Sequence, residues 1–244
     1  MTRFRDKTIL ITGGATGQGA SEARMIVAEG GRVVIGDLQE AEGKALAGEL
    51  GKCASFIHMD VSVPAHWADA INAARLLGGR LDGLVNNAGI YRPQNLRQTT
   101  LDSWQQHIAV NQTGCFLGMQ AAAEAMGNGG GGSIVNISST AGLRGSPNAF
   151  AYCASKWAVR GMTKAAALGL AASGIRVNSV HPGPINTAML AARSPEDNLA
   201  RQKLVPLGRF GEADEVARMV LYLLSDEAAF ITGAEMTVDG GVSL

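Results

Sequence analysis

The chain has 244 residues, with 21 lysines and arginines balanced by 21 aspartates and glutamates, and 46% of its residues are hydrophobic. This length fits one large domain or two small ones. The hydrophobic content excludes the disordered and low-complexity classes of protein. The balanced charge gives no net field that would attract nucleic acid or an anionic membrane. We therefore expect a folded protein whose partner is a small molecule.

Cysteine spacing and hydrophobic run length bear on the cellular compartment. Cys53, Cys115 and Cys153 lack C-x-x-C spacing, and an odd number of cysteines cannot form a complete set of disulfides. The N-terminal residues contain no hydrophobic region of a signal peptide. The longest apolar run, residues 165–172, is too short to cross a bilayer, which requires about 20 apolar residues. These features predict a cytoplasmic protein that spans no membrane.

Short β-branched runs alternate along the chain with longer stretches in which apolar residues recur every three or four positions. The short runs predict strands at residues 9–12, 33–36, 55–58, 81–85, 134–137, 176–180 and 236–238. The longer stretches predict helices at residues 19–29, 40–50, 65–77, 103–126, 151–172 and 213–224. Because the strand runs are nearly all apolar, we expect parallel strands covered by helices on both faces. The sequence thus predicts one α/β domain over residues 1–244, a doubly wound, Rossmann-type fold with a seven-stranded parallel sheet.

Residues 184–204 differ from the rest because they lack a strong periodicity and contain Pro184 and Pro195. Long connections of this kind often close over a binding site, so we expect a flap here. An ordinary surface loop would have the same composition.

A glycine-rich motif, T-G-G-A-T-G-Q-G, occupies residues 12–19, between the first predicted strand and the first predicted helix. Glycine lets a pyrophosphate approach the backbone, and the helix that follows offers unpaired N–H groups and the positive end of its dipole. A glycine-rich turn without a ligand is the alternative. The motif predicts a dinucleotide site with contacts from Gly13, Thr16, Gly17, Gln18 and Gly19.

Asp37 ends the second predicted strand, 20 residues beyond Gly17. Dinucleotide sites place a carboxylate at this position to accept hydrogen bonds from the adenosine ribose. The carboxylate would repel a 2′-phosphate, and neither Leu38 nor Gln39 offers a compensating positive charge. We therefore expect NAD as the cofactor. The alternative is that Asp37 caps the helix that begins near residue 40.

Tyr152 and Lys156 lie four residues apart in a predicted helix, so their side chains share one face about 6 Å apart along the axis. A phenol with a pKa of about 10 is a poor acid–base catalyst at neutral pH unless positive charge stabilises the phenolate. Lys156 can supply that charge and lower the pKa of the phenol. The pair predicts an acid–base tyrosine, whereas a partly buried structural tyrosine is the alternative.

In combination, these motifs resemble those of the NAD(P)-dependent short-chain dehydrogenase/reductase family, and particularly of bacterial hydroxysteroid dehydrogenases and related ketone reductases. The resemblance covers essentially the whole chain. It rests on the motif at 12–19, Asp37, Asp60 with Val61, N-N-A-G at 86–89, Asn111, N-I-S-S at 136–139, Y-C-A-S-K at 152–156 and P-G at 182–183. It implies an oxidoreductase that transfers a hydride between NAD(H) and a secondary alcohol or ketone.

The resemblance implies a role for each catalytic residue. Tyr152 would be the acid–base, Ser139 would hold the substrate oxygen, and Lys156 would bind the nicotinamide ribose. Asn111 would anchor a water that joins Lys156 to solvent. Two hydroxyls aimed at one oxygen stabilise the charge that develops there during ketone reduction. Ser138 is the rival for Ser139, because adjacent strand residues point to opposite faces.

The resemblance also extends the cofactor site along the carboxyl ends of the predicted strands, where open parallel sheets bind ligands. The further contacts it implies come from Asp60, Val61, Asn87, Ala88, Gly89, Pro182, Gly183, Ile185 and Thr187. It implies a homotetramer that pairs helices 103–126 and 151–172 across a two-fold axis, with Ala121, Ala122, Ala165 and Ala166 permitting close approach. No catalytic metal is expected, because the histidines lack i, i+4 spacing and hydride transfer requires no metal.

Two other functions remain open. One is a reductase of 3-oxoacyl thioesters, which Asp37 disfavours because anabolic reductases in the family generally prefer NADPH. The other is a dinucleotide sensor without catalysis, which the intact Ser139, Tyr152 and Lys156 disfavour. The substrate itself stays open among steroids, cyclic alcohols and aryl ketones, because a sequence does not shape the pocket wall.

Overall fold

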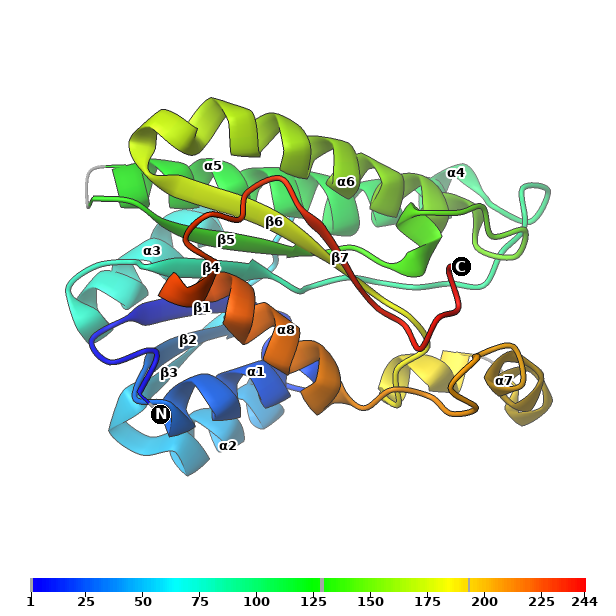
Figure 1. The fold of residues 1–244 in the computed structure, drawn as a ribbon, viewed down its shortest axis with the longest axis horizontal. Coiled ribbons are helices and arrows are strands. Elements are labelled where there is room, and N and C mark those ends of the chain that lie inside the picture. Colours follow the sequence, from blue (N-terminus) through cyan, green and yellow to red (C-terminus); the bar gives the residue numbers. More distant parts are fainter. Residues whose placement is uncertain (1, 128–129, 193) are drawn as a thin grey trace.

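A seven-stranded parallel sheet forms the centre of the computed structural model, which describes residues 2–127, 130–192 and 194–244 (Figure 1). The strand order is β3-β2-β1-β4-β5-β6-β7. The strands are β1 (Thr8–Thr12), β2 (Arg32–Asp37), β3 (Ala54–His58), β4 (Gly83–Asn86), β5 (Gly132–Ile137), β6 (Ile175–Pro182) and β7 (Glu235–Val238). Each corresponds to a predicted strand, and the doubly wound α/β architecture is confirmed.

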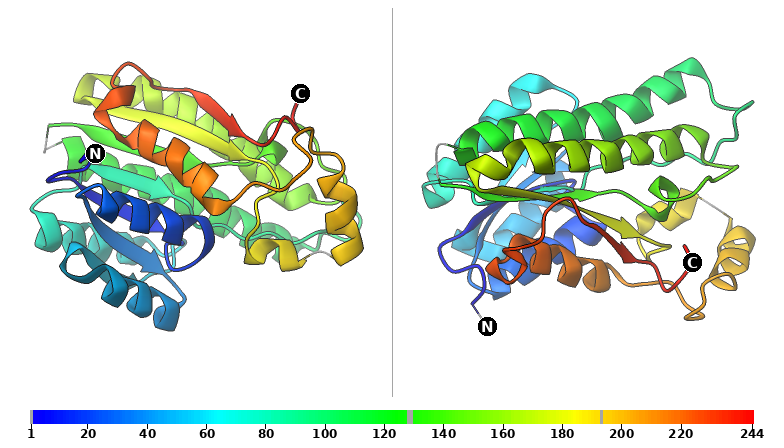
Figure 2. Two further views of the ribbon diagram at one scale, coloured as in Figure 1. Left: turned by 60° about the horizontal axis from the view of Figure 1, so that its bottom comes forward. Right: turned by 45° about the horizontal axis from the view of Figure 1, so that its top comes forward.

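Helices cover both faces of the sheet. On one face lie α1 (Gly17–Ala28), α2 (Glu40–Leu50) and α8 (Ala213–Leu224); on the other lie α3 (Pro64–Gly78), α5 (Gly114–Gly127) and α6 (Phe150–Leu170). Figure 2 shows α5 and α6 running side by side over one face while α8 crosses the opposite face.

The central strands are largely apolar because both of their faces are buried. In β1, Ile9 and Ile11 pack into the core cluster that includes α1 and α8 residues, whereas Leu10 packs into the cluster on the α3, α5 and α6 side. Side chains alternate across a strand, so two hydrophobic cores require unbroken apolar runs. This packing explains why the strands show no alternation of polar and apolar residues.

The predicted helix at residues 103–126 is divided in the structure. Helix α4 (Leu101–His107) leads into a π-helical turn (Ile108–Thr113), and α5 follows. The Thr100 side chain caps α4 by accepting a hydrogen bond from the Ser103 N–H at 3.1 Å. Wide turns of this kind are frequent at functional sites, and this one contains Asn111. The apolar periodicity continues through the turn and therefore does not reveal it.

The predicted flap, residues 184–204, is more regular than its composition indicates. It contains a 3-10 helix (Ala188–Ala192) and helix α7 (Pro195–Gln202). The Ser194 hydroxyl accepts a hydrogen bond from the Asp197 N–H at 3.1 Å, and Pro195 occupies the first helical position, where its missing N–H costs nothing. Figure 1 shows α7 beyond the strands, apart from both helical layers.

One of the four alanines predicted to lie in the subunit contact does not lie on the outer face of its helix. Ala122 is fully buried in the core of the chain itself, so it cannot touch another subunit. Ala165 is exposed, as are the aromatic side chains of Phe116 and Trp157.

Within the described part of the chain, no helix is both long enough and apolar enough to span a membrane.

Candidate active site

A cleft of about 500 Å³ follows the carboxyl ends of the strands. It lies where the strand order reverses between β1 and β4, which is where doubly wound sheets bind their ligands. Nearly all the predicted site residues line this cleft. The exceptions are Gly19, which packs behind the glycine-rich loop, and Asn111, which lines a smaller cavity.

The glycine-rich loop brings backbone segments closer than any side chain would allow. Gly13 has a φ of +61°, and a Cβ there would lie 2.8 Å from the Ala88 Cα. A Cβ on Gly19 would lie 2.4 Å from the Gly13 carbonyl oxygen. On the open side of the loop, a Cβ on Gly17 would be 3.6 Å from the Thr187 methyl group. The loop therefore forms a bare backbone cradle with the start of the flap opposite it.

Asp37 stands at the end of β2 and accepts two backbone hydrogen bonds. Its carboxylate receives the Ala15 N–H at 2.9 Å and the Gln39 N–H at 3.0 Å. Gln39 occupies the N-cap position of α2, so Asp37 is not the cap of that helix. A carboxylate has about four lone-pair sites, which leaves acceptors for a ligand in the cleft. Asp37 thus braces the glycine-rich loop and lines the cleft beside it.

Asn87 and Asp60 hold neighbouring parts of the cleft wall. The Asn87 amide donates to the carbonyls of Thr12 at 3.1 Å and Gly13 at 2.8 Å. The Asp60 carboxylate accepts from the Ser62 N–H at 2.8 Å and from its hydroxyl at 2.7 Å. Both residues line the cleft. Their side chains shape the loops that surround a ligand.

Tyr152 and Lys156 come from α6 and meet Ser139, which follows β5. The Lys156 Nζ lies 5.6 Å from the centre of the Tyr152 ring. Tyr91 packs edge-on against that ring, with centroids 5.1 Å apart and planes at 89°. The Ser138 hydroxyl instead donates to the Lys156 carbonyl at 3.0 Å, inside the protein. Ser139 is thus the serine that neighbours Tyr152.

Burial shifts the pKa of both α6 residues. It raises the pKa of Tyr152, while the nearby Ser139 hydroxyl and the Arg201 guanidinium lower it in part. Burial lowers the pKa of Lys156 to about 8. The spacing of Tyr152 and Lys156 predicts that Lys156 brings the pKa of the phenol below its ordinary value. In the structure, burial raises the pKa of Tyr152 by more than its neighbours lower it. The cation that lowers this pKa is Arg201.

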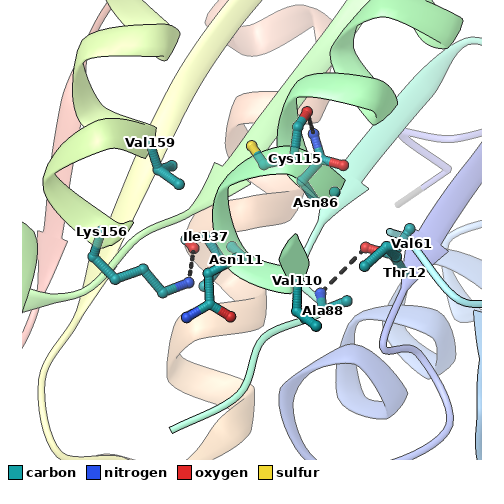
Figure 3. Close-up of a pocket in the computed structure, with 11 residues that line it drawn as sticks. Thr12, Val61, Asn86, Ala88, Val110, Asn111, Cys115, Ile137, Lys156 and Val159 are labelled. Atoms are coloured by element: carbon teal, nitrogen blue, oxygen red, sulfur yellow. Dashed lines mark hydrogen bonds between the residues drawn. The ribbon is translucent and has the colours of Figure 1, made fainter. Parts of the chain in front are cut away.

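Lys156 and Asn111 border a small cavity under the cleft (Figure 3). The buried Lys156 ammonium donates to the Ile137 carbonyl at 2.7 Å. The Asn111 amide donates to the Ile90 carbonyl at 3.0 Å and to the Ser155 hydroxyl at 3.1 Å, and its oxygen accepts from the Ile90 N–H at 2.8 Å. Asn111 therefore ties the segment after β4 to α6.

His181 lies beside the predicted site, although its spacing along the chain from the other histidines predicts no role for it. It is fully buried in β6. Its Nδ1 lies 3.1 Å from the Ser139 carbonyl oxygen, and its Nε2 lies 2.9 Å from the Ser179 hydroxyl. Because a carbonyl oxygen only accepts, Nδ1 carries a proton here. Among the described residues, no group of three histidine, cysteine or acidic side chains could hold a metal ion.

These features fit a nicotinamide dinucleotide. The bare backbone at Gly17, on the open side of the glycine-rich loop, admits a pyrophosphate at the start of α1. Asp37 offers carboxylate acceptors at one end of the cleft, and the Lys156 ammonium stands at the end that holds Tyr152.

A protein-family model described as enoyl-(acyl carrier protein) reductase matches residues 13–243. The chain belongs to the short-chain dehydrogenase/reductase family. Dehydrogenases of this family use nicotinamide dinucleotides. The resemblance stated from the sequence motifs is thereby confirmed.

Similar curated proteins include several dehydrogenases of ring compounds. The 3-alpha-(or 20-beta)-hydroxysteroid dehydrogenase of Mycobacterium tuberculosis (strain ATCC 25618 / H37Rv) is 48% identical over 239 residues, which cover 98% of this chain and 90% of the relative. The trans-4-hydroxycyclohexanecarboxylate dehydrogenase of Sinomonas cyclohexanicum is 44% identical, covering 98% of this chain and 93% of the relative. The cyclopentanol dehydrogenase of Comamonas testosteroni is 43% identical, covering 99% and 98%.

Proposed function

We propose that this protein is an NAD-dependent dehydrogenase that interconverts a cyclic secondary alcohol and its ketone. That it is an oxidoreductase of secondary alcohols follows from the family and from relatives 43–48% identical that are named as dehydrogenases of hydroxysteroids and cyclic alcohols. The observation that carries the proposal is the meeting of Ser139, Tyr152 and Lys156 at one end of a cleft whose other end holds Asp37.

In this mechanism the protein handles the proton and the substrate oxygen. Bound NAD would supply the acceptor for the hydride of the carbinol carbon. The Tyr152 phenolate takes the hydroxyl proton of the alcohol, and the Ser139 hydroxyl donates a hydrogen bond to the same oxygen. In the reverse direction the two hydroxyls stabilise the negative charge that develops on the carbonyl oxygen. Lys156 holds the cofactor ribose and keeps positive charge near Tyr152.

The proton leaves through a water between Lys156 and Asn111. The cavity that these two residues border has a volume of about 10 Å³, which is close to the space that one water occupies. A water in this cavity would have hydrogen-bond partners in the Lys156 ammonium and in the other polar groups that line it, such as Asn111.

The preference for NAD over NADP comes from Asp37. The basic side chains among the described lining residues are Lys156 and Arg201, and both lie at the Tyr152 end. A 2′-phosphate beside Asp37 would therefore face an uncompensated carboxylate. NAD carries a free hydroxyl there, which can donate a hydrogen bond to that carboxylate.

We also place the enzyme in the cytoplasm as a homotetramer. All three cysteines are unpaired, as a reducing compartment requires. The exposed Phe116 on α5 and Trp157 on α6 give the outer faces of these helices apolar contact area. Light scattering at micromolar protein checks the assembly, because a mass near the 25.3 kDa of one chain would exclude it.

A substrate screen tests the proposal. Wild-type protein is incubated with NAD or NADP and a panel of cyclopentanol, cyclohexanol and a 3α-hydroxysteroid, and formation of reduced cofactor is followed by absorbance. Reduction of an acetoacetyl thioester with NADPH is measured in parallel as the competing activity. We expect oxidation of ring alcohols with NAD. A protein that reduces only the thioester, or that turns over none of these compounds, would contradict the proposal.

A further inference from the structure

Arg201 on α7 points a cation at the catalytic end of the cleft. It lines the cleft and acts on Tyr152, where its positive charge lowers the pKa of the phenol. It comes from a helix that stands apart from the two helical layers (Figure 1). The guanidinium therefore faces the space in which a substrate with its oxygen at Tyr152 would lie.

The buried part of this guanidinium lacks a partner within the protein. The Arg201 Nε is buried, and no atom of the described residues accepts a hydrogen bond from it. Asp197, four residues earlier on α7, forms no ion pair with Arg201 in the part of the chain that the structure describes. Buried donors are nearly always satisfied in native proteins, so a cation held this way needs an acceptor from elsewhere.

The groups around Arg201 do not neutralise it. Arg144, in the segment after β5, is a second cation whose charge acts on Arg201, and Tyr152 is the other titratable group that does so. Beside them, Ile90, Tyr91 and Leu190 give the cleft wall apolar and aromatic surface. This end of the cleft thus combines apolar walls with unpaired positive charge.

We propose that Arg201 binds a carboxylate carried by the substrate, so that the enzyme acts on a ring alcohol with an acidic substituent. This inference rests on the proposed function and narrows its substrate class. A guanidinium matches a carboxylate with two parallel N–H···O bonds, while the apolar wall takes the ring.

The pyrophosphate of the cofactor is the other anion that could reach Arg201. The cradle for that group is the loop at Gly13, whereas Arg201 acts on Tyr152 at the other end of the cleft. The two acceptors predict different kinetic effects. Loss of a substrate contact changes the discrimination between acidic and neutral alcohols, and loss of a cofactor contact changes the affinity for NAD with both substrates alike.

The experiment compares trans-4-hydroxycyclohexanecarboxylate with the corresponding carboxamide, which has nearly the same shape without the charge. We expect wild-type enzyme to favour the acid in kcat/KM by about ten- to a hundredfold, as hydrogen bonds to a charged group allow. Arg201→Gln should abolish most of this preference. The ratio of the two substrates cancels any effect of the variant on the pKa of Tyr152. Lys203→Gln, which removes an exposed charge from the same segment, is the control and should keep the preference.

A binding measurement complements the kinetics. Titration calorimetry measures the binding of cyclohexanecarboxylate, which lacks the reacting hydroxyl, to wild type, Arg201→Gln and Lys203→Gln in the presence of NADH. Binding that requires Arg201 supports the proposal even where turnover is slow. An equal loss of kcat/KM for acid and amide, a loss of NAD affinity alone, or cyclohexanecarboxylate binding unaffected by Arg201→Gln would overturn it. Oxidation of neutral ring alcohols with no preference for the acid would overturn this inference and leave the proposed function intact.

Discussion

The His181 ring sits against the main chain of Ser139, with Nδ1 3.1 Å from the Ser139 carbonyl oxygen. His181 belongs to β6, and Ser139 follows β5, so the contact joins the ends of two neighbouring strands. Burial lowers the pKa of His181, which favours the neutral ring. The histidine is therefore a fixed donor that helps to position Ser139 beside Tyr152.

Replacing His181 by alanine should reduce both stability and turnover. The change removes one of two donors to the half-buried Ser139 carbonyl, which keeps the Gly142 N–H at 2.9 Å, so we expect a cost of about 0.5–1.5 kcal/mol in the free energy of unfolding. His181→Asn offers an amide donor and should recover part of the turnover. Urea denaturation and steady-state kinetics measure the two effects. A variant with normal turnover and lower stability would reduce His181 to a packing role.

Tyr152→Phe should lower turnover by about 10² to 10⁴, the range assigned to general acid–base catalysis. The variant keeps the ring that packs against Tyr91 and loses only the hydroxyl. Affinity for NAD should change little, which fluorescence titration with NADH checks. Near-normal turnover with the wild-type pH profile would mean that the proton passes through another group.

Lys156→Met should stabilise the protein at neutral pH while it removes activity. Burial lowers the pKa of Lys156 to about 8 in the folded state, against 10.5 for a lysine exposed to water. Between pH 8 and pH 10.5 the folded protein therefore binds fewer protons than the unfolded chain, and its stability rises with pH. The free energy that the buried charge takes from stability is greatest below pH 8 and falls as the pH rises toward 10.5.

The expected gain for Lys156→Met is on the order of 1–3 kcal/mol at pH 7, reduced by loss of the hydrogen bond to Ile137. Urea denaturation at pH 7 and pH 10 measures it. A gain that is equal at both pH values would contradict the electrostatic explanation.

Glu22 on α1 gives the opposite dependence on pH. It is fully buried, neither carboxylate oxygen has a hydrogen-bond partner among the described residues, and burial raises its pKa to about 8. The folded state holds a proton that the unfolded chain loses, so the stability contributed by this group falls as the pH rises from 4.5 to 8.

Glu22→Gln removes that dependence and should unfold at higher urea concentration than wild type above pH 8. The difference should grow by about 1.4 kcal/mol for each pH unit crossed within this window. Glu42→Gln on the exposed face of α2 is the control. Parallel pH profiles for wild type and Glu22→Gln would show that Glu22 has a partner in solution.

Asp37→Ala should raise the KM for NAD and narrow the discrimination against NADP. The carboxylate also accepts a hydrogen bond from the Ala15 N–H, so its loss loosens the glycine-rich loop and weakens the binding of both NAD and NADP. The ratio of kcat/KM for NAD and NADP separates the two effects. Wild-type protein that prefers NADP would exclude Asp37 as the determinant of cofactor choice.

The sequence by itself determined the features that depend on neighbours along the chain. Nearly continuous apolar runs separated by stretches of helical periodicity predict a parallel sheet between two helical layers, because such strands are buried on both faces. The T-G-G-A-T-G-Q-G motif after β1 and the spacing of Tyr152 and Lys156 are likewise local, since one turn and one helix face fix them. These patterns sufficed to predict the fold class, the glycine-rich loop and the Tyr152–Lys156 pair, whereas the other residues that line the cleft, such as Ser139 and Asp60, were predicted from the family resemblance.

Only the tertiary structure decided where distant side chains meet. Ser138 turns inward to the Lys156 carbonyl, and Ala122 packs into the core, because the placement of α5 and α6 against the sheet selects one face of each element. Arg201 lines the cleft and His181 lies against the Ser139 carbonyl only in the folded chain. No periodicity along the sequence predicts either placement. The direction of a side chain is set by the elements that pack around it, so its role at this site follows from the fold.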